Sequence, residues 1–243
     1  YPYYLLKAAA YAFFYSSDAD VASMEMRACI MEKGIDYAIR KYTGLDESDV
    51  IYTLKQHYKK ADGKFVPENA KRVTFLQKAY AIGFQAEKQY RGCAQGTLVA
   101  LSQLTGIENK DLFRAATGFS GGMALCGDGV CGGYSGGVLF MSYLKGRDFD
   151  RIPVDGDKKN QYLAYECAQL LHDHYISCYG SDICMKVHEG MFQGEYFILR
   201  TKARRDEFEK AGAHTVVCTT VVALATAWVA EILLDKNLYV LPE

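Results

Sequence analysis

The sequence lacks several features that would place it in common functional classes. Its charges nearly cancel, with a formal net charge of −1, and it has no excess of lysine and arginine. We therefore expect neither nucleic acid nor an anionic membrane as a partner. No uninterrupted apolar run reaches the roughly 20 residues that span a bilayer. The nearest run begins at Val216, contains three threonines and is interrupted by Glu231, so no membrane span is expected.

The sequence motifs of several enzyme and cofactor classes are also absent. Neither a G-x-G-x-x-G nor a P-loop pattern occurs, and the segment Gly127-Asp128-Gly129 is too short to cradle phosphate. No serine lies in a G-x-S-x-G elbow. The C-x-x-C-H pattern that attaches a c-type haem is missing too, so covalent haem is not expected. The sequence offers no acid/base constellation either.

The chain has 4 prolines in 243 residues and little strand-like alternation, so nearly every segment is predicted to be helical. We predict an all-α fold, a multi-helix bundle whose Gly/Cys-rich loop forms a metal-cluster pocket. Residues 1–89 are assigned to an N-terminal helical region and residues 90–243 to a cysteine-containing domain, with one continuous helical domain as the alternative. The predicted helices cover 21–42, 50–58, 70–104 with a break near Gly92, 111–117, 136–144, 161–178, a short helix after Gly180 capped by Ser181 or Asp182, and 216–234.

Cysteine is the residue type present in unusual number. The eight cysteines are Cys29, Cys93, Cys126, Cys131, Cys167, Cys178, Cys184 and Cys218. An even number suggests disulfides in small secreted scaffolds, but a chain of this length can bury a core without them. Metal ligation or redox-active thiols therefore explain the cysteines better.

The segment from Cys126 to Gly137 carries two of these cysteines within the densest glycine cluster of the chain. Glycine allows the backbone to close around a bulky inorganic group and to direct N–H groups at its sulfur atoms. Asp128 is assigned to a turn, and Tyr134 is expected to pack over the loop.

Cys93 and Cys218 are predicted to lie at helix N-termini, with Cys131 and Cys184 as further candidates. Such a position lowers the pKa of a thiol and favours the thiolate that binds metal. Cys167 is expected to pack within an amphipathic helix. Packing is also favoured for Cys29 and Cys178.

Two alternatives remain open at this stage. A zinc site would need ligands in close pairs such as C-x-x-C, whereas Cys126 and Cys131 are separated by four residues. A metal-free dithiol formed by the same two cysteines is the second alternative. The histidines are backup ligands only, and each is expected to be a solvated or capping residue. They are His172 and His174 on different sides of one helix, His188 one turn after Cys184, and His214 before Cys218.

Four cysteine contexts resemble the C_GCAxxG_C_C family of redox-active proteins over about residues 90–234. Cys93 lies in Gly-Cys-Ala-Gln, and Cys131 begins Cys-Gly-Gly-Tyr-Ser-Gly, with Gly133 where alanine is usual. Cys184 and Cys218 match the third and fourth family cysteines. The same portion is similar to the non-haem part of split-Soret cytochrome c.

The resemblance implies a metal or iron–sulfur centre, [2Fe–2S] or [4Fe–4S], with an electron-transfer or oxidoreductase role and a redox partner protein. Its ligands would be Cys93, Cys131, Cys184 and Cys218, with Cys126 as a fifth candidate. The tyrosine-rich N-terminal segment is compatible with a homo-oligomer interface. The chain begins at Tyr1, so export after N-terminal processing stays an alternative to a cytoplasmic location.

Overall fold

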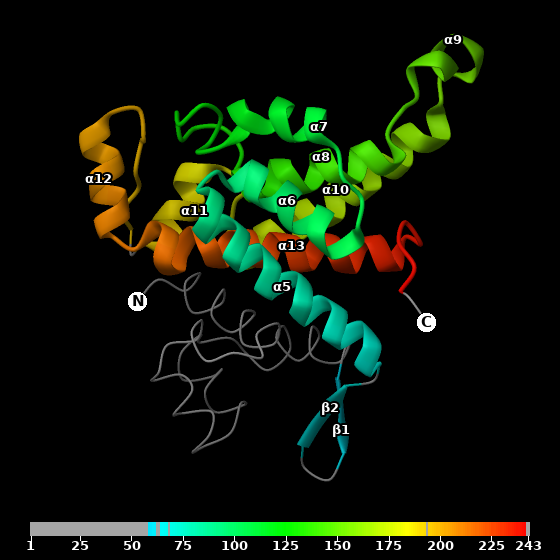
Figure 1. The fold of residues 1–243 in the computed structure, drawn as a ribbon, viewed down its shortest axis with the longest axis horizontal. Coiled ribbons are helices and arrows are strands. Elements are labelled where there is room, and N and C mark those ends of the chain that lie inside the picture. The colour runs from blue at the N-terminus through cyan, green and yellow to red at the C-terminus, as the bar shows by residue number, and fades with distance from the viewer. Residues whose placement is uncertain (1–57, 62–63, 68, 193, 242–243) are drawn as a thin grey trace.

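A computed structural model describes residues 58–61, 64–67, 69–192 and 194–241 (Figure 1). The predicted helix at 21–42, most of that at 50–58, Cys29 and the N-terminal tyrosines lie outside these residues. The described part begins with a short antiparallel hairpin, β1 (Tyr58–Ala61) and β2 (Lys64–Pro67), which the sequence analysis did not predict. The helices that follow are α5 (Ala70–Tyr90), α6 (Cys93–Thr105), α7 (Lys110–Ala115), η1 (Ala116–Phe119), α8 (Gly132–Lys145), η2 (Phe149–Arg151), α9 (Ile152–Asp155), α10 (Lys158–Tyr179), α11 (Cys184–Met191), α12 (Lys202–Lys210), η3 (Ala213–Val217) and α13 (Cys218–Asp235).

The all-α prediction is confirmed, and α13 is the centre of the bundle. This helix is apolar on every side, and its residues from Thr219 to Leu233 are all buried. α5 crosses it on one side, while α6, α8 and α10 pack against it on the other (Figure 1). Together with η3 it is long and apolar enough to cross a membrane, but 89% of its apolar window is buried by the surrounding helices.

The predicted break near Gly92 separates α5 from α6. α5 begins at the N-cap Asn69, whose side chain accepts a hydrogen bond from the N–H of Arg72. It ends at Arg91, which adopts a left-handed conformation with φ of 51° and donates its N–H to the carbonyl of Glu87. This turn places the C-terminal end of α5 beside the N-terminal end of α6.

The glycine-rich segment is a loop over residues 126–131, as predicted, but is helical from Gly132 onward, where a loop was also predicted. Cys131 is the N-cap of α8, and the helix begins at Gly132 rather than at Gly136. A Cβ at Gly133 would lie 2.6 Å from the hydroxyl of Tyr175, and one at Gly136 would lie 2.5 Å from the carbonyl oxygen of Ala94. These glycines therefore allow α8 to approach α6 and α10 closely.

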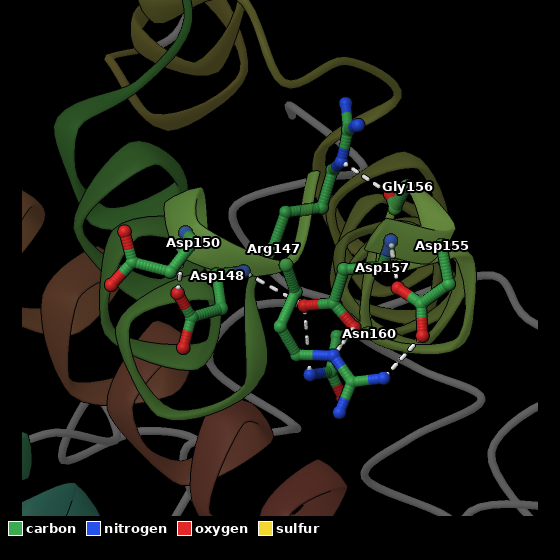
Figure 2. A network of polar contacts seen from close by, with 8 residues as sticks. Arg147, Asp148, Asp150, Asp155, Gly156, Asp157 and Asn160 are labelled. Carbon is green, nitrogen blue, oxygen red and sulfur yellow. Dashed lines mark hydrogen bonds and ion pairs between the residues drawn. The ribbon is translucent and has the colours of Figure 1, made fainter. Parts of the chain in front are cut away.

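The connection from α8 to α10 extends away from the bundle and is organised by Asp157 (Figures 1 and 2). Asp157 is buried, and its Oδ2 accepts the N–H of Asp148 at 2.7 Å and Nδ2 of Asn160 at 3.1 Å. Arg147 donates from Nε to the carbonyl of Gly156 at 3.0 Å. The segment between the helices predicted at 136–144 and 161–178 thus contains the short helices η2 and α9 and a polar network that joins two helix ends.

The predicted end of α10 is confirmed, and the start of α11 differs slightly from the prediction. Gly180 ends α10 in a left-handed conformation, as predicted. The N-cap of α11 is Ile183 rather than Ser181 or Asp182, and the Ser181 hydroxyl instead accepts the N–H of Ile183 at 3.1 Å. An isolated antiparallel bridge between Val130 and Ile183 ties the segment before α8 to the start of α11.

Candidate functional site

Four cysteines from different helices line one cavity of about 240 Å³. They are Cys93, Cys131, Cys184 and Cys218, which are 125 residues apart in sequence at their extremes. The cavity lies where the N-terminal ends of α6, α8 and α11 approach the C-terminal end of α5 and the start of α13. The fold therefore brings together the four cysteines that the sequence analysis singled out.

Three of these cysteines lie at helix N-termini. Cys93 and Cys184 are the first residues of α6 and α11, and Cys131 is the N-cap of α8. Cys218 is the first residue of α13, as predicted, but the π-helical turn η3 precedes it and its N–H is bonded to the carbonyl of Ala213. The start of α13 is thus not a free helix end.

Donor groups surround two of the sulfur atoms. Backbone N–H groups of Gly133 and Tyr134 hydrogen-bond to the sulfur of Cys131, and the Tyr175 hydroxyl lies 3.8 Å from it. The N–H of Gly121 donates to the sulfur of Cys93. Such donors stabilise negative charge on sulfur and tune the potential of a thiolate-held centre.

The Ser120 hydroxyl lies beside Cys93 and lowers the pKa of that thiol, although it makes no hydrogen bond of normal geometry.

Burial raises the pKa of all four thiols, by desolvation above all, and the pKa of Cys93 is raised to about 12. The helix N-termini do not outweigh this effect, contrary to the expectation from sequence. Free thiols in this cavity would therefore stay protonated and be poor nucleophiles. A bound cation would reverse that preference, since a coordinating thiol is deprotonated outright.

Close backbone approaches fix the positions of two cysteines. A Cβ at Gly132 would lie 2.1 Å from the sulfur of Cys93, and one at Gly122 would lie 2.7 Å from Cβ of Cys184. The N–H of Cys184 also donates to the carbonyl of Gly129 at 2.9 Å. The glycines thus serve the site by letting side chains from other helices come near.

A left-handed turn covers one side of the cavity. Five consecutive residues, from Gly121 to Leu125, have φ between 50° and 67°. The N–H groups of Ala124 and Leu125 bond to the carbonyls of Gly118 and Ser120, which holds the turn in place. Gly121 and Leu125 line the cavity from this turn.

The cavity also contains acid/base groups, which the sequence analysis did not expect. Glu87, His188 and His214 all line it. His188 is buried, Nε2 lies 3.6 Å from the sulfur of Cys184, and desolvation lowers the pKa of His188 to about 4. The expectation that each histidine is solvated or capping is wrong here. The one-turn spacing from Cys184 to His188 was the available signal, whereas nothing in the sequence marked Glu87.

The other predicted residues lie elsewhere. Cys126 does not line the cavity, and its sulfur lies 3.7 Å from the carbonyl of Ala124. Its role as a fifth ligand stays a prediction. Cys167 and Cys178 are buried in the core, as expected of packing residues. Tyr134 packs on α10 rather than over the loop, with its hydroxyl 3.3 Å from the carbonyl of Ala168.

As predicted, His172 and His174 lie on different sides of α10. His174 stacks on Trp228 with ring centroids 5.2 Å apart, and His172 is 45% exposed. Neither lines the cavity of the four cysteines.

The four thiols are chemically suited to an iron–sulfur cluster. In the described part of the chain, no three His, Cys, Asp or Glu side chains are grouped closely enough to hold one metal ion. A single zinc ion requires its four donors within about 2.0–2.3 Å of one point. A cluster distributes its thiolates over several irons, so its ligands stand farther apart. Four cysteine thiolates are the usual ligand set of [2Fe–2S] and [4Fe–4S] clusters.

Comparison with protein families agrees with this geometry. Residues 92–232 match the family described as "Putative redox-active protein (C_GCAxxG_C_C)". The matched residues make up more than half of the chain. The chain belongs to this family. All four cavity cysteines fall within the matched residues, whereas α5 and its Glu87 lie before them. No curated protein and no solved structure matches the chain.

Proposed function

We propose that this redox-active protein binds an iron–sulfur cluster through Cys93, Cys131, Cys184 and Cys218 and exchanges electrons with a partner oxidoreductase. The observation that carries the proposal is the convergence of four cysteines, two buried and two partly buried, from four separate helices on one cavity. When bound, the cluster would supply a one-electron redox couple.

The chain's own groups have clear tasks in such a site. The N–H groups of Gly121, Gly133 and Tyr134 direct partial positive charge at sulfur. Burial excludes water and strengthens these contacts, because a hydrogen bond to a charged sulfur is stronger in a medium of low dielectric constant.

The metal-free dithiol is the weaker candidate. Cys126 lies outside the cavity, and burial raises the pKa of the Cys131 thiol, which disfavours its thiolate. Neither of its two sulfur atoms is in a disulfide. A zinc ion that only stabilises the fold is the other candidate.

The test is the metal content of anaerobically purified full-length protein. We expect iron and acid-labile sulfide together with visible absorption that bleaches on reduction. Cys131→Ala and Cys184→Ala should each lose more than half of the iron, since each removes one of four ligands. Cys167→Ala is the matched control, a buried cysteine outside the cavity, and should keep its iron.

The same experiment separates the alternatives. Iron-free protein with a reversible disulfide between Cys126 and Cys131 would contradict the proposal. Zinc alone would favour a structural site. Cys126→Ala should leave the iron content unchanged, and a loss comparable to that of Cys131→Ala would make Cys126 a ligand.

A further inference from the structure

A line of three polar side chains leads from the surface into the cysteine cavity. Glu209 on α12, His214 on η3 and Glu87 on α5 all line that cavity. Oε1 of Glu209 lies 2.6 Å from Nδ1 of His214, and Nε2 of His214 lies 3.6 Å from Oε1 of Glu87. The side chains are 38%, 13% and 2% exposed in that order. The line therefore runs from solvent to the interior.

Glu87 is the unusual member of this line. Its Oε2 is buried and has no hydrogen-bond partner. Desolvation raises the pKa of Glu87 to about 8, the charge of Glu209 adds to the effect, and a backbone hydrogen bond from Gly92 offsets part of it. Burial thus favours the protonated form of this carboxyl group.

The nearby arginines do not form an ion pair with the Glu87 carboxyl group. On its own helix, Arg91 lies 3.5 Å from Glu209. On α12, Arg205 donates to the backbone carbonyls of Leu199 and Arg200 at 2.9 and 3.2 Å. Among the residues that the structure describes, His214 is the one basic group within ion-pair distance of Glu87. The remaining titratable groups that line the cavity are the four cysteines and His188.

We propose that Glu87, at alkaline pH where it is ionised in the oxidised protein, takes up a proton when the cysteine-held centre is reduced, and that His214, oriented by Glu209, delivers that proton from solvent. The proposal rests on the function proposed above. One electron from a one-electron donor protein adds a negative charge to the centre. One proton from water forms an O–H bond on the Glu87 carboxylate, and reoxidation reverses both transfers.

Electrostatics couples the two events. A negative charge added to a cavity of low dielectric constant disfavours a second one nearby, so reduction raises the proton affinity of Glu87. His214 can accept a proton on its part-exposed ring and pass it from Nε2 to Glu87, while the contact of Nδ1 with Glu209 orients the ring. The 3.6 Å separation between Nε2 and Oε1 is slightly longer than a hydrogen bond, so the transfer requires the two side chains to approach each other.

The decisive experiment is a redox titration of the full-length holoprotein across pH. For the unmodified protein, we expect a midpoint potential that is constant below the pKa of Glu87. Above it, the potential should fall by about 59 mV for each tenfold decrease in proton concentration, until the reduced state ionises as well. Glu87→Gln keeps the shape of the side chain and should remove this dependence.

Glu231→Gln is the matched control, because Glu231 is a second buried glutamate and does not line the cavity. Its titration should follow the unmodified protein. A slope that persists in Glu87→Gln would overturn the assignment.

Two further readouts separate the relay from the proposed function. If no reversible redox signal is found, both proposals fail; a reversible signal without pH dependence overturns the relay alone. The infrared C=O band of a protonated carboxyl group at pH 7 should be present in the protein and lost in Glu87→Gln, and no such difference would contradict the relay. His214→Phe should slow proton uptake after rapid reduction on the order of tenfold or more, followed with a pH-indicator dye. An unchanged rate would exclude His214 as the route.

Discussion

At Gly132, the absence of a side chain determines where the sulfur of Cys93 can lie. A methyl group there would come within 2.1 Å of that sulfur and 2.8 Å of the N–H nitrogen of Ala94. We expect Gly132→Ala to displace Cys93 and to lose most of the iron, measured as iron and sulfide per chain with the visible spectrum. Gly118→Ala is the control, because a Cβ at Gly118 would meet nothing within 4 Å. Full iron content in Gly132→Ala would show that the sulfur does not depend on this contact.

Residue by residue, the sequence predicted the cysteines of the cavity better than its acid/base groups. Cys93 and Cys131 each begin a helix beside glycine, and such a context is visible in a linear sequence. Glu87 is preceded by Ala86 and followed by Lys88, as on any solvated helix face. Gly96 on α6 packs closely against Glu87, and His214 on η3, more than 110 residues later in the chain, lies 3.6 Å from its Oε1. No local pattern reports that packing.

At the scale of elements, the glycine cluster made the predicted start of α8 four residues too late, at Gly136 instead of Gly132. Glycine clusters usually mark loops, since glycine destabilises a helix interior by about 1 kcal/mol relative to alanine. In α8 the glycines at 133 and 136 instead face α10 and α6 at distances that no larger side chain permits. Tertiary packing therefore outweighs helix propensity here, and the segment is helical from Gly132.

In the left-handed turn from Gly121 to Leu125, an alanine-to-glycine substitution should change stability in the opposite direction from the same substitution in a helix. Ala124 is exposed with φ of 50°, a conformation that costs a non-glycine residue about 1 kcal/mol or more. We expect Ala124→Gly to stabilise the protein by about 1 kcal/mol in chemical unfolding. The same substitution at Ala203, an exposed position in α12, should destabilise it by roughly 1 kcal/mol. Destabilisation by Ala124→Gly would indicate that this turn is not left-handed in solution.

At the scale of the whole molecule, the family match and the structural unit have different limits. The match begins at residue 92, just after α5 ends. Yet α5 has extensive contacts with α13, and a Cβ at its Gly83 would lie 2.9 Å from Cα of Ala223. The long helices were predictable from apolar periodicity, whereas α9 and α12 were not predicted. Which helices pair was not predictable either, because crossing points depend on contacts distant in sequence. The domain boundary assigned between residues 89 and 90 stays a prediction. Glu87, which lines the cavity from α5, lies on the N-terminal side of that boundary.

A pair of truncated chains tests whether α5 belongs to the folding unit. A chain that begins at Asn69 keeps the N-cap of α5 and should unfold in one cooperative transition with its iron bound. A chain that begins at Gly92 removes side chains such as Leu76 and Tyr80 from the core and exposes one face of α13, so it should lose cooperativity. The chain has 1 tryptophan, Trp228, which is fully buried on α13, so its fluorescence reports the packing of this core directly. A blue-shifted emission and a sharp transition in the shorter chain would mean that the matched residues fold alone and that α5 only covers the cavity.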